Sequence, residues 1–198
     1  MQALHYPLTL TFRITTLAND FTATDAGGRV VAYVRQKMLR LKEDIQIYSD
    51  ERRSQVLYNI NADRWIDWSA AYQFTDARGT PFGKVARKGW RSVWRAEYEI
   101  IDQHDRPQYR IREENGWVKV MDSLLGQIPG VGLLSGYVFN PSYLVTDHRD
   151  REIARLTKEP SFFGRRFRID KLGRTETDDD NRILLGLMMM ILLERRRG

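Results

Sequence analysis

Two stretches of the sequence combine several basic residues with aromatic ones. Residues 83–95 read GKVARKGWRSVWR, and residues 164–171 read GRRFRIDK. An arginine guanidinium can bind a phosphate through two parallel hydrogen bonds, and tryptophan is typical of membrane interfaces. The pattern therefore predicts binding of anionic lipid by Lys84, Arg87, Lys88, Arg91, Arg95, Arg165, Arg166, Arg168 and Lys171.

The same residues also have a structural explanation. On a β-strand every second side chain faces solvent, so these charges also fit a solvated strand face with aromatic residues buried beneath it. Both interpretations stay open here. The net charge of +6, from 32 Lys and Arg against 26 Asp and Glu, favours a phosphate-bearing partner. We expect no nucleic acid, because no recognition helix is evident.

Signatures of enzymes and metal sites are missing from the sequence. It contains no G-x-S-x-G elbow, no glycine-rich phosphate loop ending in Lys and Ser or Thr, and no H-E-x-x-H pair. It also contains no cysteine, which excludes thiol catalysis and zinc–thiolate sites. We therefore expect a protein that is not an enzyme and has no cofactor.

Two groups of residues could in principle bind a metal ion. His104 and His148 occupy similar places in two hairpin turns, where exposed turn residues are the more common explanation. The run TDDDN, residues 177–181, lacks the alternating ligands and distal glutamate of a calcium loop. Asp178 to Asn181 suit the N-terminus of a helix instead. We expect no metal site.

A repeat centred on aspartate organises the chain. Residues two and four before the aspartate are mostly apolar, as in a half-buried strand, and a second strand follows. The carboxylate can accept hydrogen bonds from backbone N–H groups just ahead of it. These aspartates are therefore predicted to form turns rather than to catalyse. The second copy is shifted by one residue, which predicts a different turn or a bulge. The five aspartates are Asp25, Asp50, Asp76, Asp102 and Asp147.

Further strands and one insertion complete the predicted organisation. Alternating apolar residues occur before the first repeat, from Leu8 to Ile14, and after the last, from Phe163 to Ile169. Residues 116–141 form a Gly/Pro-rich insertion between hairpins, whose apolar residues either cover one end of the core or form a patch that touches a membrane. No change in composition marks a second domain, so residues 1–198 are predicted to form one.

The closing segment is apolar on every side. Ile183 to Leu193 is a run of eleven residues without a polar side chain. As a helix it would be about 16 Å long, too short for a bilayer core of about 30 Å. A helix that is apolar all round is buried, and a sheet of about a dozen strands tends to close and leave a lumen. We therefore predict an all-β fold with one buried helix, a closed antiparallel barrel around this C-terminal segment.

These features together resemble a known family. The stretch YVRQKMLRLKEDIQIYSD, residues 33–50, followed by repeated hairpins and a terminal apolar helix, resembles the LURP-one-related proteins of the tubby-like superfamily, which includes the phospholipid scramblases. The resemblance covers roughly residues 20–195 and implies a barrel of about twelve strands around the helix. Tubby relatives bind phosphoinositide head groups at a basic external site, and scramblases act on membranes. The LURP-one-related proteins mostly lack an established activity.

The sequence thus leads to one expected function and two alternatives. We expect a non-enzymatic binding module for anionic phospholipid or a membrane surface. The first alternative is a structural or protein-interaction domain without a lipid ligand. The second is scramblase-like lipid handling, which requires the terminal helix to leave the barrel. No secretory signal is visible at the amino terminus, so we expect a cytoplasmic protein, peripheral at the membrane. The oligomeric state is not predicted.

Overall fold

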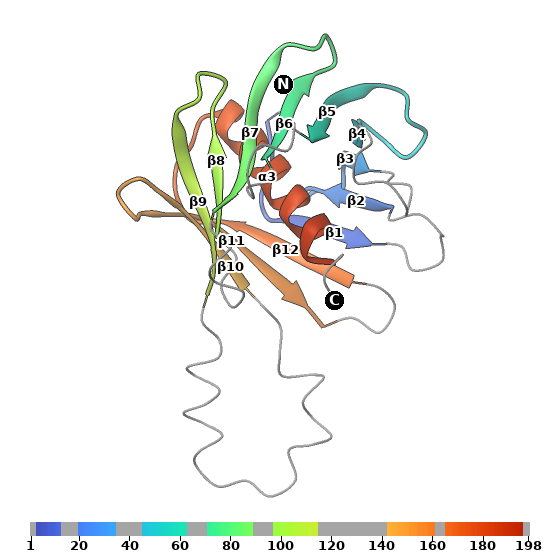
Figure 1. The fold of residues 1–198 in the computed structure, drawn as a ribbon. Helices are drawn as coiled ribbons and strands as arrows, with labels where there is room; N and C mark the ends of the chain where they lie inside the picture. The colour runs from blue at the N-terminus through green and yellow to red at the C-terminus, as the bar shows by residue number, and fades with distance from the viewer. Residues whose placement is uncertain are drawn as a thin grey trace, which may run out of the picture.

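Twelve strands in the described residues close into one antiparallel barrel (Figure 1). The computed structural model describes residues 3–12, 20–34, 45–62, 71–88, 97–114, 142–160 and 165–195. The predicted insertion, residues 116–141, lies outside these ranges. The strands are β1 (Leu8–Phe12), β2 (Phe21–Thr24), β3 (Val30–Val34), β4 (Ile45–Tyr48), β5 (Val56–Ala62), β6 (Ala71–Asp76), β7 (Pro81–Lys88), β8 (Glu97–Ile101), β9 (Pro107–Glu113), β10 (Ser142–Asp147), β11 (Glu152–Glu159) and β12 (Arg165–Lys171).

The order of the strands around the barrel follows the order of the chain. Each strand pairs with its sequence neighbours, and β1 closes the barrel by pairing with β12. Side chains alternate between the two faces, as the period of two predicts. In β1, for example, Leu8, Leu10 and Phe12 are buried, whereas Thr9 and Thr11 are half-buried. The predicted all-β barrel is confirmed.

The C-terminal helix fills the barrel. Helix α3 (Thr177–Arg195) lies among the strands in Figure 1, and its side chains belong to the same apolar cluster as the inward-facing strand residues. From Ile183 to Leu192 every side chain is buried, and Met188, Met189 and Met190 are at most 1% exposed. Flexible thioethers suit a lumen lined by unlike strands. The predicted burial of this segment on all sides is confirmed.

The repeated aspartates form the hairpin turns, as predicted. In the turn after β8, Oδ1 of Asp102 accepts hydrogen bonds from the backbone N–H of His104 (2.8 Å) and Arg106 (2.9 Å). Asp25, Asp76 and Asp147 accept the same two bonds in their own turns. The residue three positions later has positive φ in each case: Gly28, Gly79, Asp105 and Asp150.

The second turn is different, which confirms the predicted departure. Ser49 N–H donates to the carbonyl of Gln55, so this turn is two residues longer than the others, and Arg53 takes the positive φ. In three of the remaining turns an arginine four residues after the aspartate donates from Nε to its Oδ2. These arginines are Arg29, Arg106 and Arg151, at 3.0, 3.0 and 2.7 Å.

A β-bulge follows each of the five turns. One extra residue enters the second strand of each hairpin at the same place, which shifts the register against the first strand. Bulges redirect side chains at the rim of a barrel. Here the extra apolar residues pack on the core and cover it at this end, whereas the extra glutamine reaches α3. The five are Val31, Leu57, Phe82, Gln108 and Ile153.

The barrel therefore has two unlike ends. We call the end with the five aspartate turns the turn end; α3 begins there, beside the turn residue Gln103. We call the opposite end the loop end. Strands β1, β3, β5, β7, β9 and β11 finish there, and the next strand of the chain starts there.

Candidate anion-binding surface

On β7 the structure divides the predicted basic residues between two faces. Lys84 and Lys88 face outward and each is ion-paired: Lys84 Nζ lies 2.7 Å from Asp105 Oδ1, and Lys88 Nζ lies 2.7 Å from Glu99 Oε1. Arg87 shares the inner face with Val85, which belongs to the core. Outward charge on this strand is therefore largely compensated by neighbouring carboxylates.

On β12 the predicted residues have three different surroundings. Lys171 Nζ lies 2.6 Å from Asp180 Oδ2 of α3, and Arg168 Nε lies 2.9 Å from Asp170 Oδ1. Arg165 and Arg166, the first two residues of the strand, are exposed and have no ion pair within the described ranges. The charges of these two arginines, at the loop end, are therefore not neutralised by a carboxylate of the described residues.

The two predicted clusters do not meet in one patch. Strands β7 and β12 are separated by β8, β9, β10 and β11 on one side of the barrel and by six strands on the other. Arg91 and Arg95, with the tryptophans beside them, lie outside the described residues. The binding of lipid by the nine predicted residues stays a prediction.

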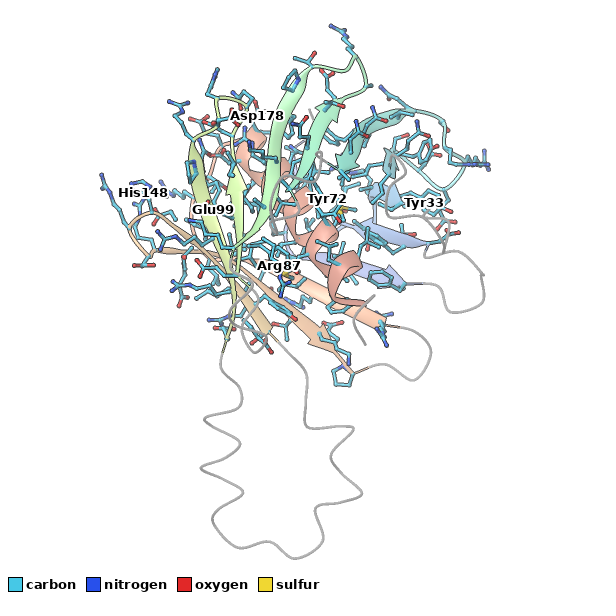
Figure 2. All side chains as sticks on the ribbon, viewed as in Figure 1. Tyr33, Tyr72, Arg87, Glu99, His148 and Asp178 are labelled. Atoms are coloured by element: carbon cyan, nitrogen blue, oxygen red, sulfur yellow. The ribbon has the colours of Figure 1, made fainter. Side chains whose placement is uncertain are left out.

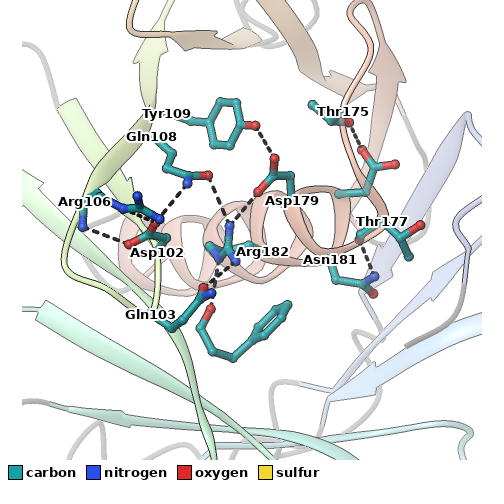
Figure 3. Close-up of polar contacts among 12 residues, drawn as sticks. Asp102, Gln103, Arg106, Gln108, Tyr109, Thr175, Thr177, Asp179, Asn181 and Arg182 are labelled. Carbon is teal, nitrogen blue, oxygen red and sulfur yellow. Dashed lines mark hydrogen bonds and ion pairs between the residues drawn. The ribbon is translucent and has the colours of Figure 1, made fainter.

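Arg182 anchors α3 at the turn end (Figure 3). Its side chain is 4% exposed, yet all three guanidinium nitrogens donate hydrogen bonds. The acceptors are the carbonyl of Phe82 at 2.9 Å, Asp179 Oδ1 at 2.6 Å, Gln108 Oε1 at 3.3 Å and Gln103 Oε1 at 3.0 Å. A buried cation is stable only when it is paired in this way. Sequence analysis missed it; the available signal was one arginine three residues after Asp179, at the front of an apolar helix.

A second set of polar contacts holds the first turn of α3. Asp180 binds Lys171 and also accepts hydrogen bonds from Thr175 Oγ1 and Tyr6. Tyr109 donates to Asp179 Oδ2 at 2.8 Å, and burial together with this carboxylate raises the pKa of Tyr109 well above its ordinary value. Burial, with a smaller contribution from the Asp178 charge, raises the pKa of Tyr58 to about 12. The predicted acidic helix N-terminus is confirmed.

The carboxylates in the first turn of α3 therefore have a structural explanation. The carboxylates of Asp179 and Asp180 are bound by protein donors, and within the described ranges no group of three or more His, Asp or Glu residues is arranged to hold a metal ion. His104 and His148 are exposed turn residues, and Figure 2 shows His148 at a turn on the barrel's periphery.

The surplus positive charge of the chain lies outside the described residues. Of the 32 Lys and Arg, 11 lie outside the described residues, compared with 5 of the 26 Asp and Glu. The described barrel therefore carries 21 charges of each sign and is neutral. The +6 is contributed by residues 196–198 and by the six segments that follow, in the sequence, the strands ending at the loop end: 13–19, 35–44, 63–70, 89–96, 115–141 and 161–164.

Among the described residues there is no helix with the length and apolar character that crossing a bilayer requires. This agrees with the short span expected of the closing segment, whose middle is buried in the barrel.

Comparison with known proteins gives the same fold. The crystal structure of a protein from Arabidopsis thaliana matches with a TM-score of 0.51 at 13% sequence identity, over 96% of this chain and 93% of that one. No curated protein matches the chain. The sequence profile of the LURP-one-related family matches residues 30–185, from β3 to the middle of α3. The chain therefore belongs to the LURP-one-related family.

Proposed function

We propose that this protein is a non-enzymatic binding module that docks the loop end of its barrel on an anionic phospholipid surface. The observation that carries the proposal is the difference in net charge between the described barrel and the chain segments between its strands. A neutral barrel joins its strands at one end through segments that hold a net positive charge. Such an asymmetric charge orients a protein as it approaches an oppositely charged surface.

The described residues at the loop end agree with this orientation. Arg165 and Arg166 are exposed where β12 begins and have no ion pair among described residues, whereas Lys84, Lys88, Arg168 and Lys171 are paired with carboxylates. An exposed basic residue near an anionic membrane contributes about 1 kcal/mol to binding. Attraction of this kind depends on surface charge density and is screened by salt over about 8 Å at physiological ionic strength.

A charge-reversal experiment tests the proposal. Arg165→Glu/Arg166→Glu reverses two charges at the loop end; Arg52→Glu/Arg53→Glu reverses two exposed charges at the turn end and gives the same net charge. We expect the first variant to lose about tenfold or more of its binding to phosphatidylserine-containing vesicles, and the second to lose much less. Binding by the parent protein should be released by salt and absent from pure phosphatidylcholine vesicles.

Two results would contradict the proposal. Equal losses in both variants would show that net charge alone attracts the protein and that the loop end has no special role. No sedimentation of the parent protein with anionic vesicles at low salt would favour the alternative, a structural or protein-interaction domain whose charges keep it in solution.

A further inference from the structure

One arginine of the loop half faces the inside of the barrel. Arg87 lies on β7 two residues after Val85, whose side chain is 1% exposed in the core, so both side chains are on the inner face. Across the strand pair Arg87 is opposite Tyr98, which is also 1% exposed.

Arg87 is half-buried and has no hydrogen-bond acceptor among the residues that the structure describes. Its Nε is buried and has no hydrogen-bond partner among the residues that the structure describes, and no ion pair to Arg87 occurs there. By contrast Arg182, the buried arginine at the start of α3, has an acceptor for each of its three nitrogens. A buried donor that lacks a partner destabilises the folded protein, so native structures retain few of them.

Two further cations share the inner face at this end. Lys158 on β11 is opposite Phe167, a core residue, and Arg165 precedes Phe167 by two positions on the same face of β12. Diagonal neighbours of this kind on one face lie about 7–8 Å apart. The inner face at the loop end thus carries cations on β7, β11 and β12 and a carboxylate, Glu113, on β9, and three strands separate β7 from β11.

We propose that Arg87 is a ligand-binding residue that takes a phosphate-type anion at the loop end. A guanidinium presents a planar fork of donors that matches two phosphate oxygens, and the missing acceptor would be supplied by the anion. The inference rests on the proposed function in one respect: docking by the loop end brings lipid phosphates to this side of the barrel. The phosphate belongs to a lipid head group or is free in solution, and the experiment below distinguishes these sources.

A structural role predicts the opposite behaviour of a variant. Cations near the C-terminus of a helix stabilise it, so Arg87 would then help to hold the end of α3. Under the ligand-binding role, Arg87→Met removes a half-buried charge whose buried Nε has no partner among the described residues, and the melting temperature without anion should stay the same or rise. Under the structural role it should fall. Arg182→Met, which removes a fully paired buried cation, serves as the destabilised reference.

Inorganic phosphate and vesicles are then tested separately. If the anion is free, inorganic phosphate should raise the melting temperature of the parent protein above that in sodium chloride of equal ionic strength, and Arg87→Met should lose that rise. If it belongs to a lipid, phosphate should have no effect, and Arg87→Met should bind phosphatidylserine vesicles about tenfold more weakly. A lower melting temperature of Arg87→Met without anion would overturn the inference, as would unchanged vesicle affinity together with no phosphate effect. Arg165→Glu/Arg166→Glu could still lose vesicle binding in that case, and the proposed function would stand.

Discussion

At the scale of single residues, the turn aspartates show how local chemistry makes a fold predictable. Burial by itself would raise the pKa of Asp102, but the backbone N–H groups of Arg106 and His104 and the Arg106 guanidinium outweigh it and hold this pKa below its ordinary value. The pKa values of Asp25 and Asp147 are lowered in the same way, whereas the backbone N–H groups of Thr80 and Arg78 are the main donors that lower the pKa of Asp76. All the partners lie within six residues, so the sequence alone indicated the role of each aspartate.

These lowered pKa values predict acid sensitivity. A carboxyl whose pKa is lower in the folded state stabilises the fold above its unfolded pKa of about 3.9, and that contribution is lost as the pH falls through the folded pKa. We expect the free energy of unfolding in urea to decrease below about pH 4. Asp102→Asn, which loses the charged partner of Arg106, should cost about 1–3 kcal/mol at neutral pH and should flatten the pH dependence. An unchanged slope in this variant would contradict the role assigned to Asp102.

A matched pair of glycines tests the packing beside Arg182. Gly83 has a φ of 132°, and a Cβ built there would lie 2.5 Å from the Ile101 carbonyl oxygen and 2.9 Å from Arg182 Cδ. Gly79 also has positive φ, but nothing lies within 4 Å of its Cβ position. Gly83→Ala should therefore cost about 2–4 kcal/mol and Gly79→Ala about 1 kcal/mol. Equal costs, measured by chemical unfolding, would show that Arg182 does not depend on Gly83.

At the scale of elements, the burial of α3 could be predicted because its apolar composition is compatible only with a position inside the protein. A run of eleven residues without a polar side chain, too short for a bilayer, had to be buried in protein. The bulges after the other four turns were not predicted, because an extra residue changes the register between two strands and leaves little trace in the apolar pattern of one strand. The hydrogen-bond partners of Arg182 could not be predicted either, because Phe82, Gln103 and Gln108 are 74 to 100 residues away in the sequence.

The burial of α3 gives the prediction for this scale. Met189 is fully buried, so Met189→Asp places a carboxylate in the apolar lumen and should destabilise the protein by several kcal/mol or unfold it. Met189→Leu keeps the volume and polarity of the site and should cost less than about 1.5 kcal/mol. Thermal unfolding of both variants checks this. A melting temperature of Met189→Asp equal to that of the parent would mean that the helix is not the core of the barrel.

At the scale of the whole molecule, the closed barrel could be predicted by counting strands. Which surface residues lie next to one another could not be predicted in that way. The number of alternating segments and the apolar helix led to the correct architecture. Whether the two basic clusters form one patch depends on the order of strands around the barrel, and that order puts four strands between them. The ion pairs could not be predicted from the sequence either, because Lys84–Asp105 and Lys171–Asp180 join different parts of the fold.

The electrical asymmetry of the molecule is the property on which the proposed function depends. The described barrel is neutral, and the net positive charge of the chain comes from residues 196–198 and from the segments that follow, in the sequence, the strands ending at the loop end. A membrane would therefore meet this end first, with the five aspartate turns facing away from it.

The depth of two labels in a membrane tests this orientation most directly. The native chain has no cysteine, so Ala62→Cys and Ala77→Cys each provide a single exposed attachment point, at the loop end and the turn end respectively. With phosphatidylserine-containing vesicles, we predict that a fluorophore at residue 62 is quenched by a quencher on the lipid head group and that one at residue 77 is not. Equal quenching at both residues, or stronger quenching at residue 77, would contradict docking by the loop end.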